Sequence, residues 1–287
     1  MCDEDIHPGL IEDPTVSRRT FGLIGVGAMG LATGAVAQAR VVEKDVEVKT
    51  PDGTCDAALY YPEGRGSWPA VIVWPDIVGL RPVFREMGRR LAGSGYVVLV
   101  VNPFYRSKRA PVVTGTFNFA NPADRAIVVG YRAQMTDAGV DADAAAFVAF
   151  LDAQPQTDRR ARIGVQGYCM GGPLSFRTAA AAPGRIGAVA SFHGGGLATQ
   201  EANSPHLLIP RTNASYLIAV ADNDDQRDPQ AKETLKAAFA AAGKPAVVEV
   251  YKGAAHGWTV RGSDAYDEPA AEKAWAELLA LYRRFLT

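Results

Sequence analysis

The stretch GVQGYCMGG, residues 164–172, decides how the rest of the sequence is interpreted. An apolar run, RIGVQGYC (162–169), leads into it, and an alanine-rich segment follows it. Gly167, Cys169 and Gly171 occupy the pattern G-x-S-x-G with cysteine in place of serine, which is typical of a sharp turn between a strand and a helix. The glycines are needed because the strand and the helix approach too closely for a Cβ atom. We therefore interpret Cys169 as a presented nucleophile, and a buried structural cysteine is the alternative.

The start of a helix directly after Cys169 gives the thiol two chemical advantages. The first turn of a helix has unpaired N–H groups and a partial positive charge, which favour a thiolate over a thiol. The N–H of Met170 can also donate to a developing oxyanion, and such a donor is worth about 3 kcal/mol. Both effects favour nucleophilic catalysis.

Composition and charge narrow the class of protein only broadly. The chain has 287 residues, of which 48% are hydrophobic and 21% charged, as in a soluble globular protein. The formal net charge of −1 gives no indication of binding to nucleic acid or to an anionic membrane surface. The three cysteines form no CxxC pair and no zinc-spaced cluster with histidine, so we expect neither a structural metal nor a disulfide framework. Hydrolysis by a nucleophilic cysteine requires no cofactor, and we expect none.

Residues 1–37 have the pattern of a twin-arginine export signal. Arg18 and Arg19 precede an apolar, glycine-rich stretch, and an A-x-A cleavage pattern ends at Ala37. We expect cleavage before Gln38, a periplasmic or secreted mature protein, and no stable membrane association after cleavage. If the signal is not used, the protein is cytoplasmic.

The same stretch admits two other interpretations. Gly25, Gly27 and Gly30 spell the dinucleotide-binding pattern G-x-G-x-x-G, but nothing downstream continues a nucleotide-binding repeat. An uncleaved membrane anchor is disfavoured because the apolar run is shorter than the about 20 residues that a span needs.

After a short lead-in (38–44), residues 45–287 alternate strand-like and helix-like segments in one domain. Apolar runs and a turn at Pro51-Asp52-Gly53 predict strands, and 3.6-residue periodicity predicts helices. The pattern predicts an α/β fold with about eight mostly parallel strands and helices on both faces of the sheet. The expected strands are 45–50, 55–62, 69–76, 96–104, 162–169, 187–194, 216–224 and 246–254, and the expected helices are 81–93, 138–153, 171–182, 229–242 and the last segment, which includes 271–285.

A nucleophilic cysteine needs a base and a carboxylate that orients the base. His256, in GAAHGW between the last strand and the last helix, is the candidate base, whereas His193 is more consistent with a structural role. Asp224, in the acidic segment ADNDD, is the candidate carboxylate. The chain order Cys169, Asp224, His256 is the order of the α/β-hydrolases.

The segment WPDIVGLRP (74–82) ends another predicted strand at the same edge of the sheet. We expect the N–H of Ile77 to be the second oxyanion donor beside Met170, and Asp76 to point toward Cys169.

These motifs together resemble the dienelactone hydrolase family, the cysteine branch of the α/β-hydrolases. The resemblance runs from about residue 45 to the C-terminus. It implies an α/β-hydrolase fold, a Cys169–Asp224–His256 triad, and hydrolysis of a small-molecule ester or lactone through a thioester. It rests on PDIVGLRP, GYVVLVVNPFYR, GYCMGGPLSF, SFHGGG, ADNDD and YKGAAHGW, in family order.

The resemblance also implies roles for residues around the thiol. The family commonly has a glutamate where this chain has Asp76, and that glutamate is thought to hold the resting thiol until substrate binds. Asp76 and Trp258 are thus expected to gate the thiol or line its pocket. Arg106 matches one of two arginines that grip a substrate carboxylate, and Arg261 is the candidate for the other.

Two rival functions stay open at this point. One is a general carboxylesterase or acyl hydrolase without preference for lactones. The other is a non-catalytic binding protein on a hydrolase scaffold. A redox pair of Cys169 with Cys55 is disfavoured because Cys55 has no CxxC context.

Overall fold

The structure is a computed structural model that describes residues 40–115 and 117–286. The expected export signal over residues 1–37 lies outside the described residues and stays a prediction. No helix of the described ranges is both long and apolar enough to cross a bilayer.

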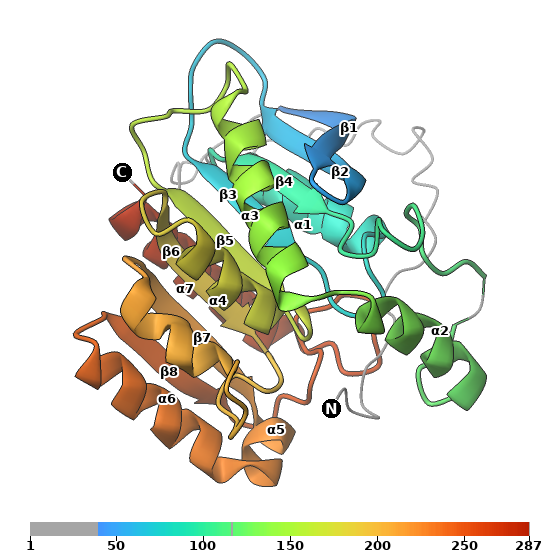
Figure 1. Ribbon diagram of the computed structural model, residues 1–287, viewed down its shortest axis with the longest axis vertical. Helices are drawn as coiled ribbons and strands as arrows, with labels where there is room; N and C mark the ends of the chain where they lie inside the picture. Colours follow the sequence, from blue (N-terminus) through green and yellow to red (C-terminus); the bar gives the residue numbers. More distant parts are fainter. Residues whose placement is uncertain (1–39, 116, 287) are drawn as a thin grey trace, which may run out of the picture.

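One eight-stranded sheet forms the centre of the domain, as predicted (Figure 1). Its strand order is β1-β2-β4-β3-β5-β6-β7-β8. β1 pairs with β2, and β2 with β4, in antiparallel register, and all the other neighbours are parallel. The bounds are β1 (Val41–Thr50), β2 (Gly53–Pro62), β3 (Ala70–Trp74), β4 (Val97–Val101), β5 (Ile163–Tyr168), β6 (Ile186–Phe192), β7 (Ser215–Ala221) and β8 (Ala246–Tyr251).

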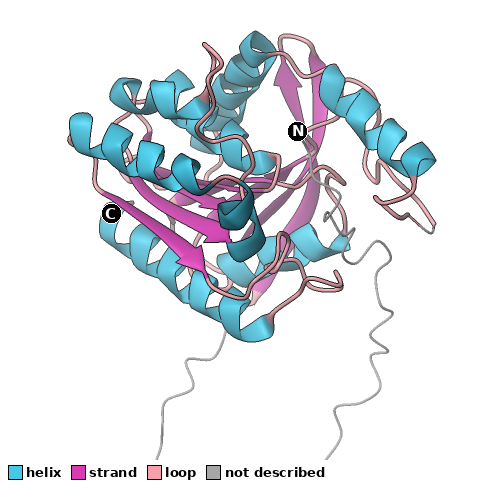
Figure 2. Ribbon diagram, turned by 90° about the horizontal axis from the view of Figure 1, so that it is seen from below, coloured by secondary structure: helices cyan, strands magenta, loops and turns pink. Residues whose placement is uncertain are grey.

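Helices cover both faces of the sheet (Figure 2). α1 (Pro82–Ala92) and α7 (Glu268–Phe285) cover one face, and α3 (Asp137–Asp152), α4 (Gly171–Ala181) and α6 (Pro229–Ala241) cover the other. The central strands β3, β4 and β5 are buried along their whole length, which explains their continuous apolar sequences. Each face therefore has its own hydrophobic core.

Two short helices and one projecting helix complete the described chain. α5 (Asp222–Arg227) follows β7 directly, and η1 (Pro205–Arg211) is a 3₁₀ helix. α2 (Pro122–Ala133) projects from the body at the lower right of Figure 1.

Three of the differences between the structure and the predicted elements concern β1, the end of β7 and α2. β1 begins at Val41, inside the expected lead-in 38–44, because residues 41–44 pair with β2. The strand expected to reach residue 224 ends at Ala221, where α5 begins. α2 was not predicted, although Asn121 caps its first turn by accepting from the Ala123 N–H, with Pro122 at the first helical position.

The turn around Cys169 confirms the interpretation of the glycines. A Cβ atom on Gly167 would lie 1.9 Å from the Gly171 carbonyl oxygen. A Cβ on Gly171 would lie 2.3 Å from the carbonyl oxygen of Trp74, at the end of β3. Cys169 has a φ of 52°, in the left-handed region that costs a non-glycine residue free energy. The strand, the helix and the neighbouring strand thus hold the cysteine in a strained conformation.

Replacing Gly167 by alanine should lower the free energy of unfolding by about 3 kcal/mol, because the Cβ meets backbone atoms that cannot rotate away. Gly184→Ala is the control, since no atom lies within 4 Å of its Cβ position, and it should change stability by less than about 1 kcal/mol. Urea unfolding of both variants measures the difference. Equal stabilities would contradict the close approach at the elbow.

Candidate active site

The three predicted triad residues come together from the ends of three strands. Cys169 follows β5, Asp224 lies in α5 after β7, and His256 follows β8. Nδ1 of His256 lies 2.6 Å from Oδ2 of Asp224. Cys169 and His256 both line one cavity of about 410 Å³, so the thiol and the imidazole can reach the same bound molecule.

The loop that carries His256 is tied to the segment that carries Asp224. The His256 N–H donates to Oδ1 of Asn223 at 2.9 Å, and the Asp222 N–H donates to the Ala254 carbonyl at 2.9 Å. These bonds set the ring of His256 against the carboxylate of Asp224.

The neighbouring aspartates of this segment have other partners. Asp222 binds Lys252, and Asp225 binds Lys232. Asp224 is therefore the aspartate of α5 whose carboxylate reaches the imidazole, in agreement with its choice from the sequence.

The second ring nitrogen of His256, Nε2, is not used in a structural hydrogen bond among the described residues. His256 is 3% exposed, and its Nε2 has no well-aligned hydrogen bond among the described residues. Cys169 acts on the same ring electrostatically and raises its pKa. The imidazole thus lies between a carboxylate on one side and the cysteine on the other.

The electrostatic environment favours the charged form of this histidine. Burial opposes a charged ring, but Cys169 and Asp224 together outweigh burial and raise the pKa of His256 to about 10. His256 is consequently an imidazolium at neutral pH in the free protein.

His193 packs against the triad without joining it. Its ring meets the His256 ring edge-on, with centroids 4.9 Å apart, and its Nε2 lies 2.9 Å from Oγ1 of Thr259. Burial, followed by the charge of His256, lowers the pKa of His193 well below its usual value. His193 is therefore a neutral neighbour, as the structural interpretation of its sequence position predicts.

The two predicted oxyanion donors lie on elements that touch. Gly171 packs against the carbonyl oxygens of Trp74 and Pro75, which brings the loop after β3 against the start of α4. Within the described part of the chain, the N–H groups of Ile77 and Met170 have no hydrogen-bond acceptor. An oxyanion that develops on a bound carbonyl group requires unpaired N–H donors of this kind.

Asp76 does not have the environment that we expected from the sequence. Its carboxylate binds the guanidinium of Arg81 with two bonds, at 2.6 and 2.8 Å, and Asp76 does not line the cavity of Cys169. Arg81 lies only five residues away, so the loop closes on itself.

Trp258 is also placed differently from the expectation. It is fully buried, with its ring stacked on Tyr251 and against the edge of His193, and it does not line the cavity. Its large apolar surface packs in the hydrophobic core on the α7 face of the sheet.

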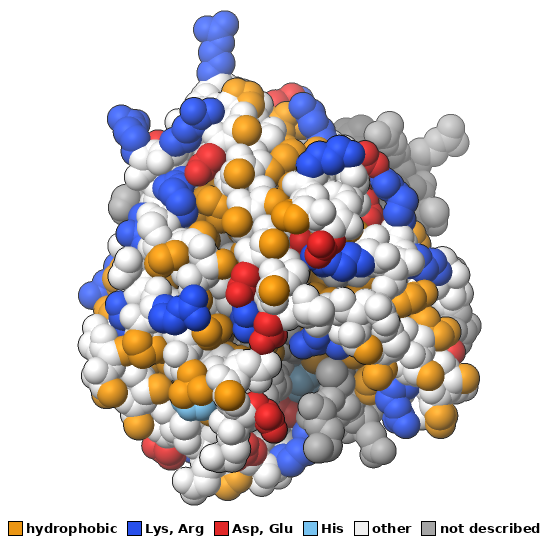
Figure 3. Space-filling model, viewed as in Figure 1, with side chains coloured by type: hydrophobic (Ala, Val, Ile, Leu, Met, Phe, Trp, Pro, Cys, Tyr) orange, Lys and Arg blue, Asp and Glu red, His pale blue; other side chains and the backbone are white. Residues whose placement is uncertain are grey.

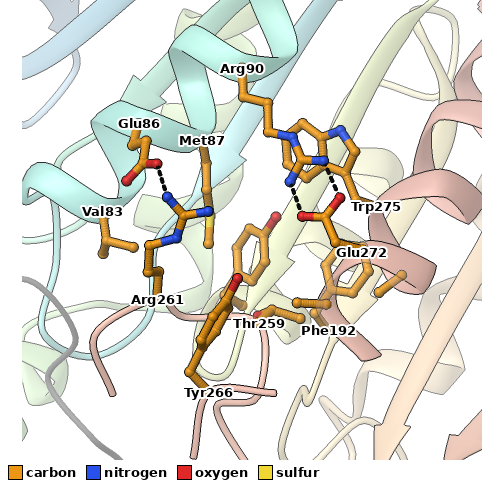
Figure 4. A pocket seen from close by; sticks show the side chains of 13 residues that line it. Val83, Glu86, Met87, Arg90, Phe192, Thr259, Arg261, Tyr266, Glu272 and Trp275 are labelled. Atoms are coloured by element: carbon orange, nitrogen blue, oxygen red, sulfur yellow. Dashed lines mark hydrogen bonds and ion pairs between the residues drawn. The ribbon is translucent and has the colours of Figure 1, made fainter. Parts of the chain in front are cut away.

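Neither predicted substrate arginine lines the cavity of Cys169. Arg106 is held by two carboxylates, Asp143 at 2.7 Å and Asp52 at 2.7 Å. Arg261 binds Glu86 at 2.6 Å above a separate small pocket between α1 and α7 (Figure 4). Existing ion pairs therefore occupy both side chains.

Two other arginines line the cavity and were missed from the sequence. Arg177 of α4 is paired with Asp137 and Asp141. Arg132, near the end of α2, donates to the Met135 carbonyl at 3.3 Å and has no acidic partner among the described residues. The sequence signal that was overlooked is the Asn121-Pro122 start of α2, which predicts a helix there. Arg132 lies on that helix, which places it at the cavity.

Other potential sites are sparse in the described ranges. No group of three or more histidine, cysteine and acidic side chains there is arranged to hold a metal ion. Cys55 is buried, its Sγ donates to the Asn102 carbonyl, and burial raises the pKa of this thiol. On the face shown in Figure 3, basic and acidic side chains are interspersed rather than gathered in one field.

A strained cysteine between a strand and a helix, with a histidine and an aspartate at neighbouring strand ends, defines the α/β-hydrolase class. The sequence matches the dienelactone hydrolase family over residues 55–286, so the chain belongs to that family and is a dienelactone hydrolase-like ester hydrolase.

Named relatives and solved structures agree with this assignment. The chain is 28% identical to a putative carboxymethylenebutenolidase of Methylorubrum extorquens, covering 99% of this chain and 98% of the relative. It is 25% identical to a carboxymethylenebutenolidase of Rhodococcus opacus, covering 83% and 90%. A putative dienelactone hydrolase of Klebsiella pneumoniae has the same fold, with a TM-score of 0.74, 23% identity and coverage of 85% of this chain and 99% of the other.

The protonation of His256 gives a testable pH dependence. Its ring should stay protonated through neutral pH and titrate near pH 10 in nuclear magnetic resonance spectra of the imidazole nitrogens. Because the native ring holds its proton more tightly than the unfolded chain, its contribution to stability is complete below about pH 6.5 and is lost as the pH rises toward 10.

Cys169→Ala should lower this pKa, since it removes the stronger of the two interactions that raise it. His206, which lies outside the cavity and is bonded to Ser204, is the internal control, and its imidazole signals should be the same in both proteins. An unchanged titration of His256 in the variant would contradict the coupling between thiol and imidazole.

Proposed function

We propose that the protein hydrolyses a carboxylic ester or lactone through a thioester on Cys169. The observation that carries the proposal is the shared cavity of Cys169 and His256, with His256 held by Asp224 at 2.6 Å. The lactone part of the proposal is supported by the names of the relatives, which are carboxymethylenebutenolidases.

In the first half of the reaction, the sulfur of Cys169 attacks the carbonyl carbon of the substrate. The carbonyl oxygen becomes an oxyanion and accepts from the N–H groups of Met170 and Ile77. The carbon–oxygen bond to the leaving group then breaks, and the His256 imidazolium donates its proton to the departing alkoxide. In a lactone this alkoxide stays attached to the acyl group through the opened ring.

In the second half, neutral His256 takes a proton from a water molecule, and the hydroxide attacks the thioester carbon. The carbon–sulfur bond breaks, the acid is released, and the sulfur leaves as a thiolate beside the reprotonated imidazole. Asp224 keeps Nδ1 directed toward itself throughout, so Nε2 always faces the reacting atoms.

The triad assignment predicts the effect of removing each member. Cys169→Ala and His256→Ala should each lower kcat for an aryl ester by at least about 10³-fold in a folded protein, because each removes a covalent or proton-transfer step. Steady-state hydrolysis with a circular dichroism check of folding measures this.

His206→Ala is the matched control, since this histidine lies outside the cavity. Full activity of either triad variant would refute the mechanism. An inactive wild-type protein whose Cys169 also resists alkylation would instead favour a binding protein on a hydrolase scaffold.

We further propose that Arg132 binds a carboxylate of the substrate. It lines the cavity and is not engaged by an acidic residue of the described chain, whereas Arg177 is engaged twice. Glu201 also lines the cavity, but it is exposed, so solvent screens its charge. The family preference for an anionic lactone would thus be met from α2 instead of from Arg106 or Arg261.

Arg132→Gln should reduce kcat/KM about 10- to 100-fold for a carboxylate-bearing lactone, the worth of one charge-assisted bond, and by less than about 3-fold for a neutral aryl ester. Arg261→Gln is the control, since Arg261 lies in the other pocket (Figure 4), and it should affect neither substrate. Equal losses on both substrates would contradict an anion-binding role, and no preference in the wild type would indicate a general carboxylesterase.

A further inference from the structure

The ion pair of Asp76 and Arg81 is the most deeply buried one among the described residues. Their side chains are 3% and 1% exposed, and two parallel bonds of 2.6 and 2.8 Å join the carboxylate to the guanidinium. A pair removed from water in this way is costly to form and is retained only with good geometry and further hydrogen bonds. Its position in the loop after β3 therefore calls for an explanation.

The further side-chain bonds of the pair hold the backbone around Ile77. Oδ1 of Asp76 accepts from the Val78 N–H at 2.9 Å, and the Asp76 carbonyl accepts from the Gly79 N–H at 2.9 Å. Arg81 closes the loop from the other side by donating to the Gly79 carbonyl at 3.1 Å. These bonds join the residues on both sides of Ile77 in the chain, and its own N–H has no acceptor among the described residues.

Three donor groups already engage the Asp76 carboxylate, and the thiol of Cys169 is not among them. Both of its oxygens accept from Arg81, and Oδ1 also accepts from a backbone N–H. Arg81 cannot release it easily, because its guanidinium is buried against the ring of Phe84, 4.9 Å from the centroid. A switch of Asp76 to Cys169 would leave a buried cation unpaired, which is strongly unfavourable.

We propose that the Asp76–Arg81 pair is a clasp that fixes the Ile77 N–H as an oxyanion donor and does not gate the thiol. Asp76 and Arg81 are positioning residues in this proposal, since neither touches the reacting atoms. The inference rests on the proposed hydrolysis at Cys169. It implies that Cys169 is paired with His256 before substrate arrives, without a carboxylate to be displaced.

Two measurements separate a clasp from a gate. Ester hydrolysis passes through an oxyanion, so it depends on the Ile77 donor. Alkylation of Cys169 by iodoacetamide displaces iodide from a carbon and forms no oxyanion, so it reports only on the reactivity of the thiol. A gate that holds the thiol would make alkylation faster when its carboxylate is removed.

The experiment compares Asp76→Asn and Arg81→Lys with the wild type, using an aryl ester and iodoacetamide at neutral pH. For a clasp, kcat should fall about 10- to 100-fold, as expected for a displaced oxyanion donor, with KM within about 3-fold. The alkylation rate should stay within about 2-fold. Arg85→Lys, in an exposed ion pair on α1, is the matched control and should change neither rate.

Three results would overturn the proposal. Faster alkylation of Asp76→Asn would indicate a gate, and an unchanged kcat in both variants would exclude a positioning role. Parallel losses of kcat and alkylation would indicate general damage to the fold. If Asp76→Asn does not fold, Arg81→Lys decides alone, because it keeps the charge and removes only the paired geometry.

Cys169→Ala, assayed in parallel, keeps the two proposals distinct. Retained hydrolysis in that variant would refute the proposed function, whatever the Asp76 and Arg81 variants show.

Discussion

The close approach of β5, α4 and the end of β3 is the constraint on which the site depends. Gly167 lets strand and helix meet, and Gly171 lets the helix meet the Trp74 carbonyl. The same approach brings the loop after β3, which carries Ile77, against the start of α4, where Met170 follows Cys169. The strained backbone of Cys169 and the contact between the segments that carry the two proposed oxyanion donors thus follow from one packing arrangement, which requires glycine at positions 167 and 171.

The charge states of the two buried histidines at the site depend on their electrostatic partners. His256 is almost fully buried, yet its pKa is raised to about 10, because Cys169 and Asp224 together outweigh the cost of burial. His193, packed edge-on against it, has no such partners, and burial lowers its pKa. His256 is therefore charged and the neighbouring His193 is neutral at the same pH. Both rings are buried, so the difference comes from their partners and not from their exposure.

Three charged residues to which the family resemblance assigns roles at the site are instead held in ion pairs with other residues of the chain. Asp76 is bound by Arg81, Arg106 by Asp143 and Asp52, and Arg261 by Glu86. Each of these charged groups is therefore already neutralised by a partner. Arg132, which lines the cavity and has no acidic partner in the part of the chain that the structure describes, lies on a helix that projects from the body of the domain.

The sequence by itself determined the α/β class, the elbow and the chemical identity of the three triad candidates. These features are local, because strands, glycine turns and residues after strand ends are visible as short patterns. The tertiary structure decided which charged side chains are held in ion pairs and which can meet a bound molecule. Whether a carboxylate or a guanidinium faces a cavity depends on partners that are close in space: Arg106 meets Asp143, 37 residues away, and Arg261 meets Glu86, 175 residues away. Even Asp76 and Arg81, five residues apart, become a pair only because the loop between them folds back under burial.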